Sequence, residues 1–315
     1  MSSVPMTSFS VPEPIPDGII ERRLPKHPPD IMTATNEFSK YKALVFDCYG
    51  TLIDWETGIY TGLKPLFEQA RKPADRHAVI DAFSAVERDL QARFPTMRYS
   101  DLLAKVHATL EARLQDKPTP PDASATKEPV LASAHTDTGD AQAGSASVDT
   151  SAAAAQAASS KTSAAEAFAR SVAAWQPFAD TIPALAALSK RYRLIILSNI
   201  DRETIAKTRA VLERGFAFDA VYTAEEVGAY KPAPEMLGFA LARLEADFGV
   251  RKEEVLMTAQ SVFHDIVPAK GRDMDTAWIN RAGAVTGLEG VKGDEAKYVF
   301  PTLGDLSDAV EKTGA

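Results

Sequence analysis

Residues 44–55 read LVFDCYGTLIDW, and this stretch decides the fold. Its apolar run stops abruptly at Asp47, as expected for a strand that is buried on both faces of a parallel sheet. A carboxylate at a strand end suits a metal ligand or a nucleophile, because Asp with its ordinary pKa of about 3.9 is ionised at neutral pH. Gly50 lets the backbone turn sharply and approach a ligand. Taken alone, Asp47 fits better with a carboxylate that only caps the following turn.

Further strands are predicted over residues 193–200, 219–227, 253–261, 276–280 and 298–300, and helical patterns such as 233–248 separate them. The strands over 193–200 and 253–261 also end among polar residues. Strands that alternate with helices predict an α/β fold with a doubly wound, Rossmann-like parallel sheet. Ligands bind such sheets at the carboxyl ends of the strands. Four polar clusters are expected there: residues 47–51, Ser198 with Asn199, Lys231, and residues 260–265.

The rest of the chain divides by composition. Residues 59–115 carry apolar side chains at three- and four-residue spacing, which predicts helices. Residues 116–163 are rich in Ala, Ser, Thr, Asp and Pro and contain no aromatic residue, so we expect a disordered insertion. Residues 1–40, rich in Pro, Ser and Thr, predict a disordered tail. A helix is expected at 163–175.

Composition argues against several classes of protein. The formal charge of −8, from 35 basic and 43 acidic residues, disfavours a nucleic-acid-binding surface. No apolar run is long enough to span a membrane, and the N-terminus lacks the pattern of a signal peptide. The single cysteine, Cys48, excludes a disulfide framework and suits a reducing compartment. We therefore expect a cytoplasmic protein.

Four short motifs occur in a fixed order along the chain. They are DCYGTLID at 47–54, the strand that ends in Ser-Asn, Lys231 in YKPAP, and Asp265 in QSVFHDIVPAK. Together they resemble the motifs of the haloacid dehalogenase superfamily. The resemblance implies a Rossmann-like core domain over 41–58 and 176–315, with a helical cap domain over 59–175 inserted after the first strand. The predicted insertion at about 116–163 would lie inside that cap.

The resemblance also implies a role for each motif residue. Asp47 matches the nucleophile of the superfamily, and Lys231 matches the cation that orients it. Thr51 and Ser198 match hydroxyls that hold the nucleophile or the anionic group of the substrate. Asp265 matches the acid of the fourth motif.

Tyr49 stands where the phosphatases of this superfamily have a second aspartate that protonates the departing alkoxide. A halide leaves without a proton, so a branch that expels halide needs no acid there. At this position the sequence resembles the L-specific 2-haloacid dehalogenases. The phosphatases also bind Mg²⁺ through carboxylates, and Ser261 replaces one of these here. We therefore expect no cofactor, with Mg²⁺ at Asp47 and Asp265 as the alternative.

The expected reaction is a two-step displacement on a short 2-haloalkanoic acid. Asp47 attacks C2, expels the halide and forms an enzyme ester. A water oriented by Asp265 and Asn199 then releases the 2-hydroxy acid. The expected substrate contacts, made through backbone N–H groups or side chains, come from Cys48, Tyr49, Trp55, Ser198 and Asn199.

Several alternatives stay open. The dehalogenases receive the halide on an Arg of the cap, and Arg88, Arg93 and Arg98 are candidates that also suit solvated helix charges. His264 either helps to activate water or bonds a backbone carbonyl at the strand end. The rival functions are a Mg²⁺-dependent phosphatase of a small phosphomonoester and a scaffold protein without catalysis. We expect a small anionic substrate, no nucleic-acid or membrane partner, and either a monomer or a homodimer.

Overall fold

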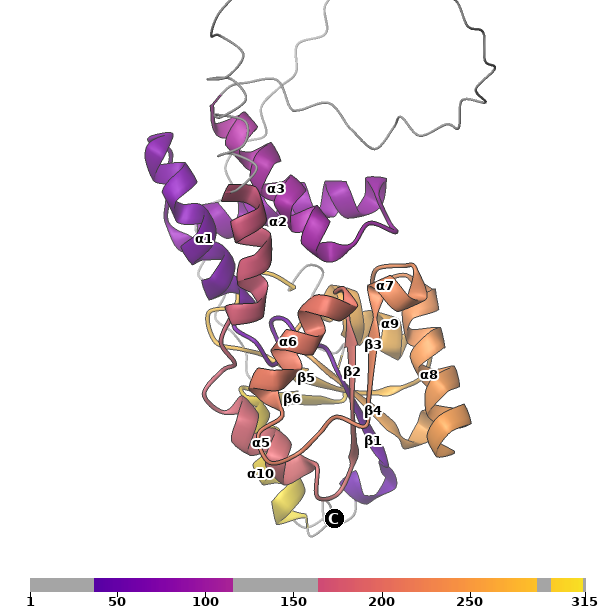
Figure 1. Cartoon of the computed structure of the whole chain (residues 1–315). Helices are drawn as coiled ribbons and strands as arrows, with labels where there is room; N and C mark the ends of the chain where they lie inside the picture. Colours follow the sequence, from indigo (N-terminus) through magenta and orange to yellow (C-terminus); the bar gives the residue numbers. More distant parts are fainter. Residues whose placement is uncertain (1–36, 116–163, 288–295, 314–315) are drawn as a thin grey trace, which may run out of the picture.

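The computed structural model describes residues 37–115, 164–287 and 296–313. Within them, a parallel sheet has the strand order β3-β2-β1-β4-β5-β6 (Figure 1). This arrangement confirms the predicted α/β, Rossmann-like fold. Residues 1–36 of the predicted tail and the insertion predicted over 116–163 lie outside the described residues.

The strands are short, and the central ones are buried. Their bounds are β1 (Ala43–Phe46), β2 (Arg193–Ser198), β3 (Ala220–Thr223), β4 (Val255–Ala259), β5 (Asp275–Ile279) and β6 (Tyr298–Phe300). β1 pairs with β2 on one side and with β4 on the other. From β1, the chain adds β2 and then β3 on one side of the sheet. It then returns to the other side of β1 and adds β4, β5 and β6 there. The carboxyl ends of β1 and β4 therefore form the switch point at which such sheets bind ligands.

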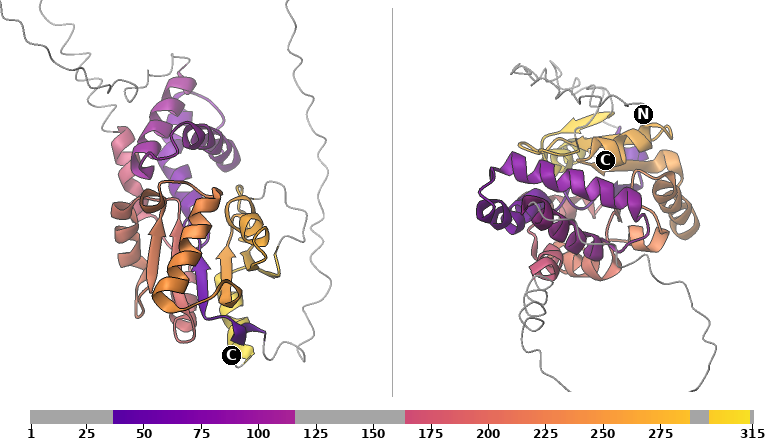
Figure 2. Two further views of the ribbon diagram at one scale, coloured as in Figure 1. Left: turned by 90° about the vertical axis from the view of Figure 1, so that its right-hand side faces the viewer. Right: turned by 90° about the horizontal axis from the view of Figure 1, so that it is seen from above.

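Helices cover both faces of the sheet (Figures 1 and 2). α5 (Thr181–Leu188), α6 (Arg202–Leu212) and α10 (Leu303–Lys312) lie on one face, and α8 (Pro234–Phe248) and α9 (Val267–Lys270) lie on the other. Right-handed crossovers explain this division, because the two winding directions place their helices on opposite faces. Short turns complete the core: η1 (Phe38–Lys40), η3 (Val172–Ala174), α7 (Ala224–Val227), η4 (Lys252–Glu254) and η5 (Val262–Ile266).

A helical layer lies beyond the carboxyl ends of the strands (Figure 1). It consists of α1 (Trp55–Gln69), α2 (Arg76–Arg93) and α3 (Tyr99–Leu114), which pack against one another. Asp54 and Asp75 begin α1 and α2, since each carboxylate accepts a hydrogen bond from a backbone N–H of the first turn. The helical residues 164–171 join this layer, and the ring of Phe168 lies against α1 at Gly62.

Several predicted boundaries differ from the structure, two of them by about a helical turn. The strand predicted over 219–227 ends at Thr223, because the Thr223 hydroxyl accepts a hydrogen bond from Glu226 N and begins α7. The tail predicted over 1–40 is wrong for its last residues, since η1 buries Phe38 with its ring 4.9 Å from that of Tyr298. Across the described residues, no helix is long and apolar enough to cross a lipid bilayer.

Candidate active site

The end of β1 places Asp47 in a buried position, with 7% of the residue exposed. Thr51 Oγ1 donates a hydrogen bond to Oδ2 at 2.8 Å, and Lys231 Nζ donates one to Oδ1 at 2.7 Å. Both oxygens are held, which fixes the orientation of the carboxylate. The turn between Asp47 and Thr51 needs a glycine, because Gly50 has a φ of 99° and a Cβ there would lie 2.8 Å from Trp55 Nε1.

Lys231 is the centre of a buried charge network. Its ammonium donates to Asp47 Oδ1 at 2.7 Å, to Asp265 Oδ1 at 2.9 Å and to the Leu197 carbonyl at 3.0 Å. An ammonium has three N–H groups, so all of them are used. Burial lowers the pKa of Lys231, but the two carboxylates outweigh it and raise the pKa, so the side chain stays a cation.

Asn199 positions the backbone of Lys231. The Asn199 Nδ2 donates to the Lys231 carbonyl at 3.1 Å, and Oδ1 accepts from Lys231 N at 2.6 Å. The side chain that follows β2 thereby aims the Lys231 ammonium at the end of β1. These two contacts engage both polar atoms of the Asn199 side-chain amide. They indicate that Asn199 positions Lys231, whereas the prediction from the sequence is that Asn199 orients the attacking water.

Asp265 lies in η5, a π-helical turn directly after β4. Ser261 begins this turn: its Oγ accepts from His264 N at 3.2 Å and lies 3.0 Å from His264 Nδ1. Burial raises the pKa of Asp265 to about 7; Lys231 opposes the shift and the charge of Asp47 adds to it. Among the described residues, Asp265 Oδ2 is a buried oxygen without a hydrogen-bond partner. Such a carboxyl can accept a proton near neutral pH.

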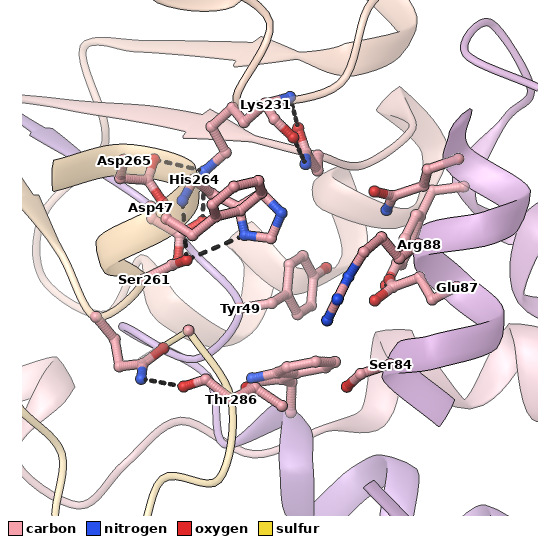
Figure 3. A pocket seen from close by; sticks show the side chains of 17 residues that line it. Asp47, Tyr49, Ser84, Glu87, Arg88, Lys231, Ser261, His264, Asp265 and Thr286 are labelled. Carbon is pink, nitrogen blue, oxygen red and sulfur yellow. Dashed lines mark hydrogen bonds and ion pairs between the residues drawn. The ribbon is translucent and has the colours of Figure 1, made fainter. Parts of the chain in front are cut away.

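A cavity of about 170 Å³ opens between these strand ends and the helical layer (Figure 3). Its floor is formed by the network of Asp47, Lys231 and Asp265, and α2 forms the facing wall. The predicted site residues that line it are Asp47, Tyr49, Trp55, Arg88, Asn199, Lys231, Ser261, His264 and Asp265.

Three predicted site residues do not line the cavity. Thr51 is fully buried and acts on Asp47 through its hydroxyl. Cys48 is also fully buried, so only its backbone could meet a substrate. The Ser198 residue is 1% exposed, and this burial does not support the predicted contact between its hydroxyl and the substrate.

Sequence reasoning missed most of the wall that the helical layer contributes. Ser84, Glu87 and Gln91 line the cavity beside Arg88 on α2. Their three- and four-residue spacing marks one stripe of a helix, and that spacing was visible in the sequence. Nothing in the sequence showed that this stripe faces the strand ends. The further lining residues that were not predicted as site residues are Tyr99, Gln260, Phe263, Thr286 and Gly287.

The other two arginine candidates lie elsewhere. Arg93 Nη1 lies 3.6 Å from Asp89 Oδ2 on the same helix. Arg98 contacts carboxylates of the core, with Nη2 3.7 Å from Asp201 Oδ1 and Nε 3.5 Å from Glu225 Oε1. Of the three candidates, Arg88 is the one among the cavity-lining residues.

Tyr49 is tied to the core through its hydroxyl, which shares a hydrogen bond with Thr208 Oγ1 of α6 at 2.8 Å. Its ring packs edge-on against Trp175, with the centroids 6.1 Å apart. Burial raises the pKa of the Tyr49 hydroxyl well above its ordinary value. The hydroxyl is therefore a poor proton donor to a leaving group.

A loop after β5 braces the nucleophile turn. Arg281 is 6% exposed, and its Nη2 donates to the Thr51 carbonyl at 2.8 Å while Nη1 pairs with Asp180 Oδ1 at 2.6 Å. The Thr51 hydroxyl, which donates to Asp47, also accepts from Gln260 N at 2.9 Å. Thr51 thus transmits the position of two neighbouring loops to the Asp47 carboxylate.

The strand ends offer few oxygen ligands to Mg²⁺, the alternative expected at Asp47 and Asp265, because Asp265 Oδ2 is the one oxygen of these two carboxylates without a hydrogen-bond partner among the described residues. In the part of the chain that the structure describes, no group of three or more His, Cys, Asp or Glu side chains could hold a metal ion. Mg²⁺ requires octahedral oxygen coordination. Here the Oδ1 atoms of both carboxylates accept from one Lys231 ammonium, and Ser261 Oγ is engaged with His264.

A comparison of the sequence with models of known protein families gives the same assignment as the four motifs. Residues 41–266 match the family described as haloacid dehalogenase-like hydrolase, and this match covers more than half of the chain. The chain belongs to the haloacid dehalogenase-like hydrolases. The similarity predicted from the four motifs is confirmed, and the protein is a hydrolase of this superfamily.

Two curated relatives of this hydrolase differ in activity. Haloacetate dehalogenase H-2 of Moraxella sp. strain B is 34% identical over 109 residues, which are 34% of this chain and 46% of that protein. Pyrophosphatase PpaX of Halalkalibacterium halodurans is 28% identical over 136 residues, which are 43% of this chain and 60% of that protein. The chain therefore spans less than two thirds of the length of either relative.

Solved structures share the fold of this hydrolase. L-2-haloacid dehalogenase from Xanthobacter autotrophicus, with chloropropionic acid covalently bound, superposes with a TM-score of 0.57 at 19% identity. The match covers 86% of this chain and 98% of that one. At this identity the likeness shows the fold, and the chemistry has to be argued from the residues of the cavity.

Proposed function

We propose that this hydrolase is a 2-haloacid dehalogenase that displaces halide from a 2-haloalkanoic acid through an aspartyl ester. The observation that carries the proposal is the pairing of a fixed carboxylate, Asp47, with a Tyr49 hydroxyl that is bonded to Thr208 and is a poor acid. An alkoxide leaving group needs a proton from the enzyme, and a halide does not. The partial similarity to haloacetate dehalogenase H-2 supports the same reaction class.

In the first step, a carboxylate oxygen of Asp47 attacks C2 of the substrate. The carbon–halogen bond breaks, and the halide leaves with the bonding electron pair. Lys231 and Thr51 keep the nucleophile aligned through their hydrogen bonds. Arg88 is proposed to receive the halide, because its cation lies on the wall that faces the floor of the cavity.

The substrate carboxylate needs donors close to Asp47. The hydrogen bonds of the described residues include none from the backbone N–H groups of Cys48 and Tyr49. These two N–H groups follow the nucleophile directly, so we propose that they bind the substrate carboxylate. Trp55 lines the same cavity and offers an apolar surface to the carbon chain.

In the second step, a water attacks the carbonyl carbon of the Asp47 ester. Asp265 accepts the proton of this water, since its Oδ2 is unpartnered among the described residues and burial raises its pKa to about 7. The acyl C–O bond of the ester then breaks, and the departing alkoxide takes up the proton that Asp265 accepted. The 2-hydroxy acid leaves with an oxygen of Asp47, and the carboxylate is restored with an oxygen from water, whose second proton passes to solvent.

The experiment measures chloride release from (S)- and (R)-2-chloropropionate. Wild type is expected to release chloride from at least one enantiomer, and Asp47→Asn from neither. A single turnover in ¹⁸O-water is expected to label the Asp47 peptide rather than the product. Tyr49→Phe is expected to keep chloride release within about threefold, because the hydroxyl donates no proton to the halide. Absence of chloride with both enantiomers contradicts the proposal.

A phosphatase is the second candidate, because pyrophosphatase PpaX is among the relatives. Its assay uses pyrophosphate and a chromogenic phosphate ester, with Mg²⁺ and with EDTA. Metal-dependent phosphate release without any chloride release would replace the dehalogenase by a phosphatase. Turnover of neither substrate class would favour a scaffold without catalysis.

A further inference from the structure

The cavity wall that faces Asp47 is polar. α2 contributes Ser84, Glu87, Arg88 and Gln91 to it, and Figure 3 shows Glu87 and Arg88 extending from this helix toward the side of the cavity that Tyr49 occupies. A short 2-haloalkanoic acid carries only carbon and hydrogen beyond C2. Such a chain offers no hydrogen-bonding group to this polar wall, although burying polar groups against an apolar chain costs free energy.

Within residues 37–115, 164–287 and 296–313, one of the two carboxyl oxygens of Glu87 has a hydrogen-bond partner. The hydroxyl of Tyr99 donates a hydrogen bond to Glu87 Oε1. The Tyr99 ring packs edge-on against Tyr230, with the centroids 6.4 Å apart, so the donor is itself held in place. No hydrogen bond of the described residues reaches Glu87 Oε2. A half-buried carboxylate oxygen of this kind is a binding group for a donor inside the cavity.

The volume of the cavity also indicates a substrate that is larger than 2-chloropropionate. A buried water takes up roughly 10–15 Å³ of such a volume, so the cavity of about 170 Å³ holds on the order of ten water-sized groups. A 2-chloropropionate ion has about six non-hydrogen atoms and would fill roughly half of this space. A substrate that fills the cavity therefore extends to the α2 wall.

We propose that the substrate carries a second, uncharged hydrogen-bonding group, a hydroxyl or an amide, which donates to Glu87 several carbons away from the reacting C2. The proposal rests on the dehalogenase function and names the substrate class within it. Burial raises the pKa of Glu87 to about 7, against the opposing effects of the Tyr99 hydrogen bond and the Arg88 charge, so Glu87 is mostly ionised at pH 8. The two charges on the wall are then adjacent and opposite, which favours an uncharged group, because Glu87 repels a second carboxylate and Arg88 repels an ammonium group.

The test compares two substrates of equal size. These are 2-chloro-6-hydroxyhexanoate and 2-chloroheptanoate, which differ by a hydroxyl in place of a methyl group. At pH 8, where Glu87 is mostly ionised, wild type is expected to favour the hydroxyl compound by about tenfold in kcat/KM, the usual effect of one hydrogen bond to a charged acceptor. Glu87→Leu is expected to bring this ratio to about one, and Glu87→Gln, which keeps an acceptor oxygen, to retain part of it.

Asp89→Asn is the matched control, because Asp89 is an exposed carboxylate on the same helix that pairs with Arg93. It is expected to leave the substrate ratio unchanged. Equal kcat/KM for the two compounds in wild type, or faster turnover of 2-chloroadipate than of either, overturns the inference. Chloride release from 2-chloropropionate alone overturns it too and leaves the dehalogenase function in place. No chloride from any of these compounds overturns the proposed function itself.

Discussion

Replacing Lys231 with Met tests the charge network that holds the nucleophile. Met has a similar length and no charge, so the variant removes the ammonium and keeps most of the packing. In the wild type this ammonium lies 2.7 Å from Asp47 Oδ1 and 2.9 Å from Asp265 Oδ1, and its side chain is 4% exposed. Without it, two buried carboxylates share one site with no cation between them.

The expected magnitude follows from the burial of all three groups. Removing one partner of a buried ion pair costs about 3–5 kcal/mol of unfolding free energy, because a charge is left without compensation. Activity is expected to fall by at least about 10²-fold, since the Asp47 carboxylate loses the hydrogen-bond partner that aligns it.

The cost depends on pH. Burial raises the pKa of Asp265 to about 7 even though Lys231 opposes the shift, so removing Lys231 raises the pKa further. A folded pKa above the unfolded value of about 3.9 means that the folded state binds the proton more tightly. Stability therefore falls as pH rises from about 4 toward the folded pKa. We expect Lys231→Met to be least destabilised near pH 5 and most destabilised above pH 8.

The assay is urea unfolding followed by circular dichroism at acid, neutral and alkaline pH. Lys207→Met is the matched control, because Lys207 lies 2.8 Å from Glu203 Oε1 with 54% of its side chain exposed. Such a surface pair contributes about 0–1 kcal/mol. Equal losses of unfolding free energy in the two variants, or a loss in Lys231→Met that does not grow with pH, would refute the reasoning.

Two further predictions concern the second step and the nucleophile turn. If Asp265 accepts the proton of the attacking water, kcat is expected to rise with pH around the Asp265 pKa of about 7 and then to become constant. Asp265→Asn is expected to lower kcat by about 10²–10⁴-fold, while mass spectrometry still detects alkylated Asp47. A profile that stays flat across this range would contradict that role. Arg281→Gln is expected to lose about 1.5–3 kcal/mol of unfolding free energy and about tenfold in kcat with little change in KM, because Arg281 acts through Thr51. Arg193→Gln, which removes an exposed ion pair, is the control, and equal losses in both variants would count against the bracing role.

The sheet and its strand-end residues could be predicted because the signals are local. A four-residue apolar run such as Ala43–Phe46 fits a strand buried on both faces, and the polar residue after it lies at the carboxyl end by geometry. In the same way, the sequence predicted Asn199 and Asp265 after the ends of β2 and β4, the two strands that pair with β1. It failed for residues 224–227, where Thr223 caps a helix inside a pattern that also suits a strand.

The sequence by itself determined the α/β class, the positions of the strand ends and the presence of a tyrosine, not an acid, two residues after Asp47. Only the tertiary structure decided which side chains share the cavity. A strand end is defined by a few consecutive residues, but the orientation of α2 depends on packing between segments far apart in the chain. That packing turns Glu87 and Arg88 toward the strand ends, and it brings the ammonium of Lys231 between two carboxylates that the sequence separates widely.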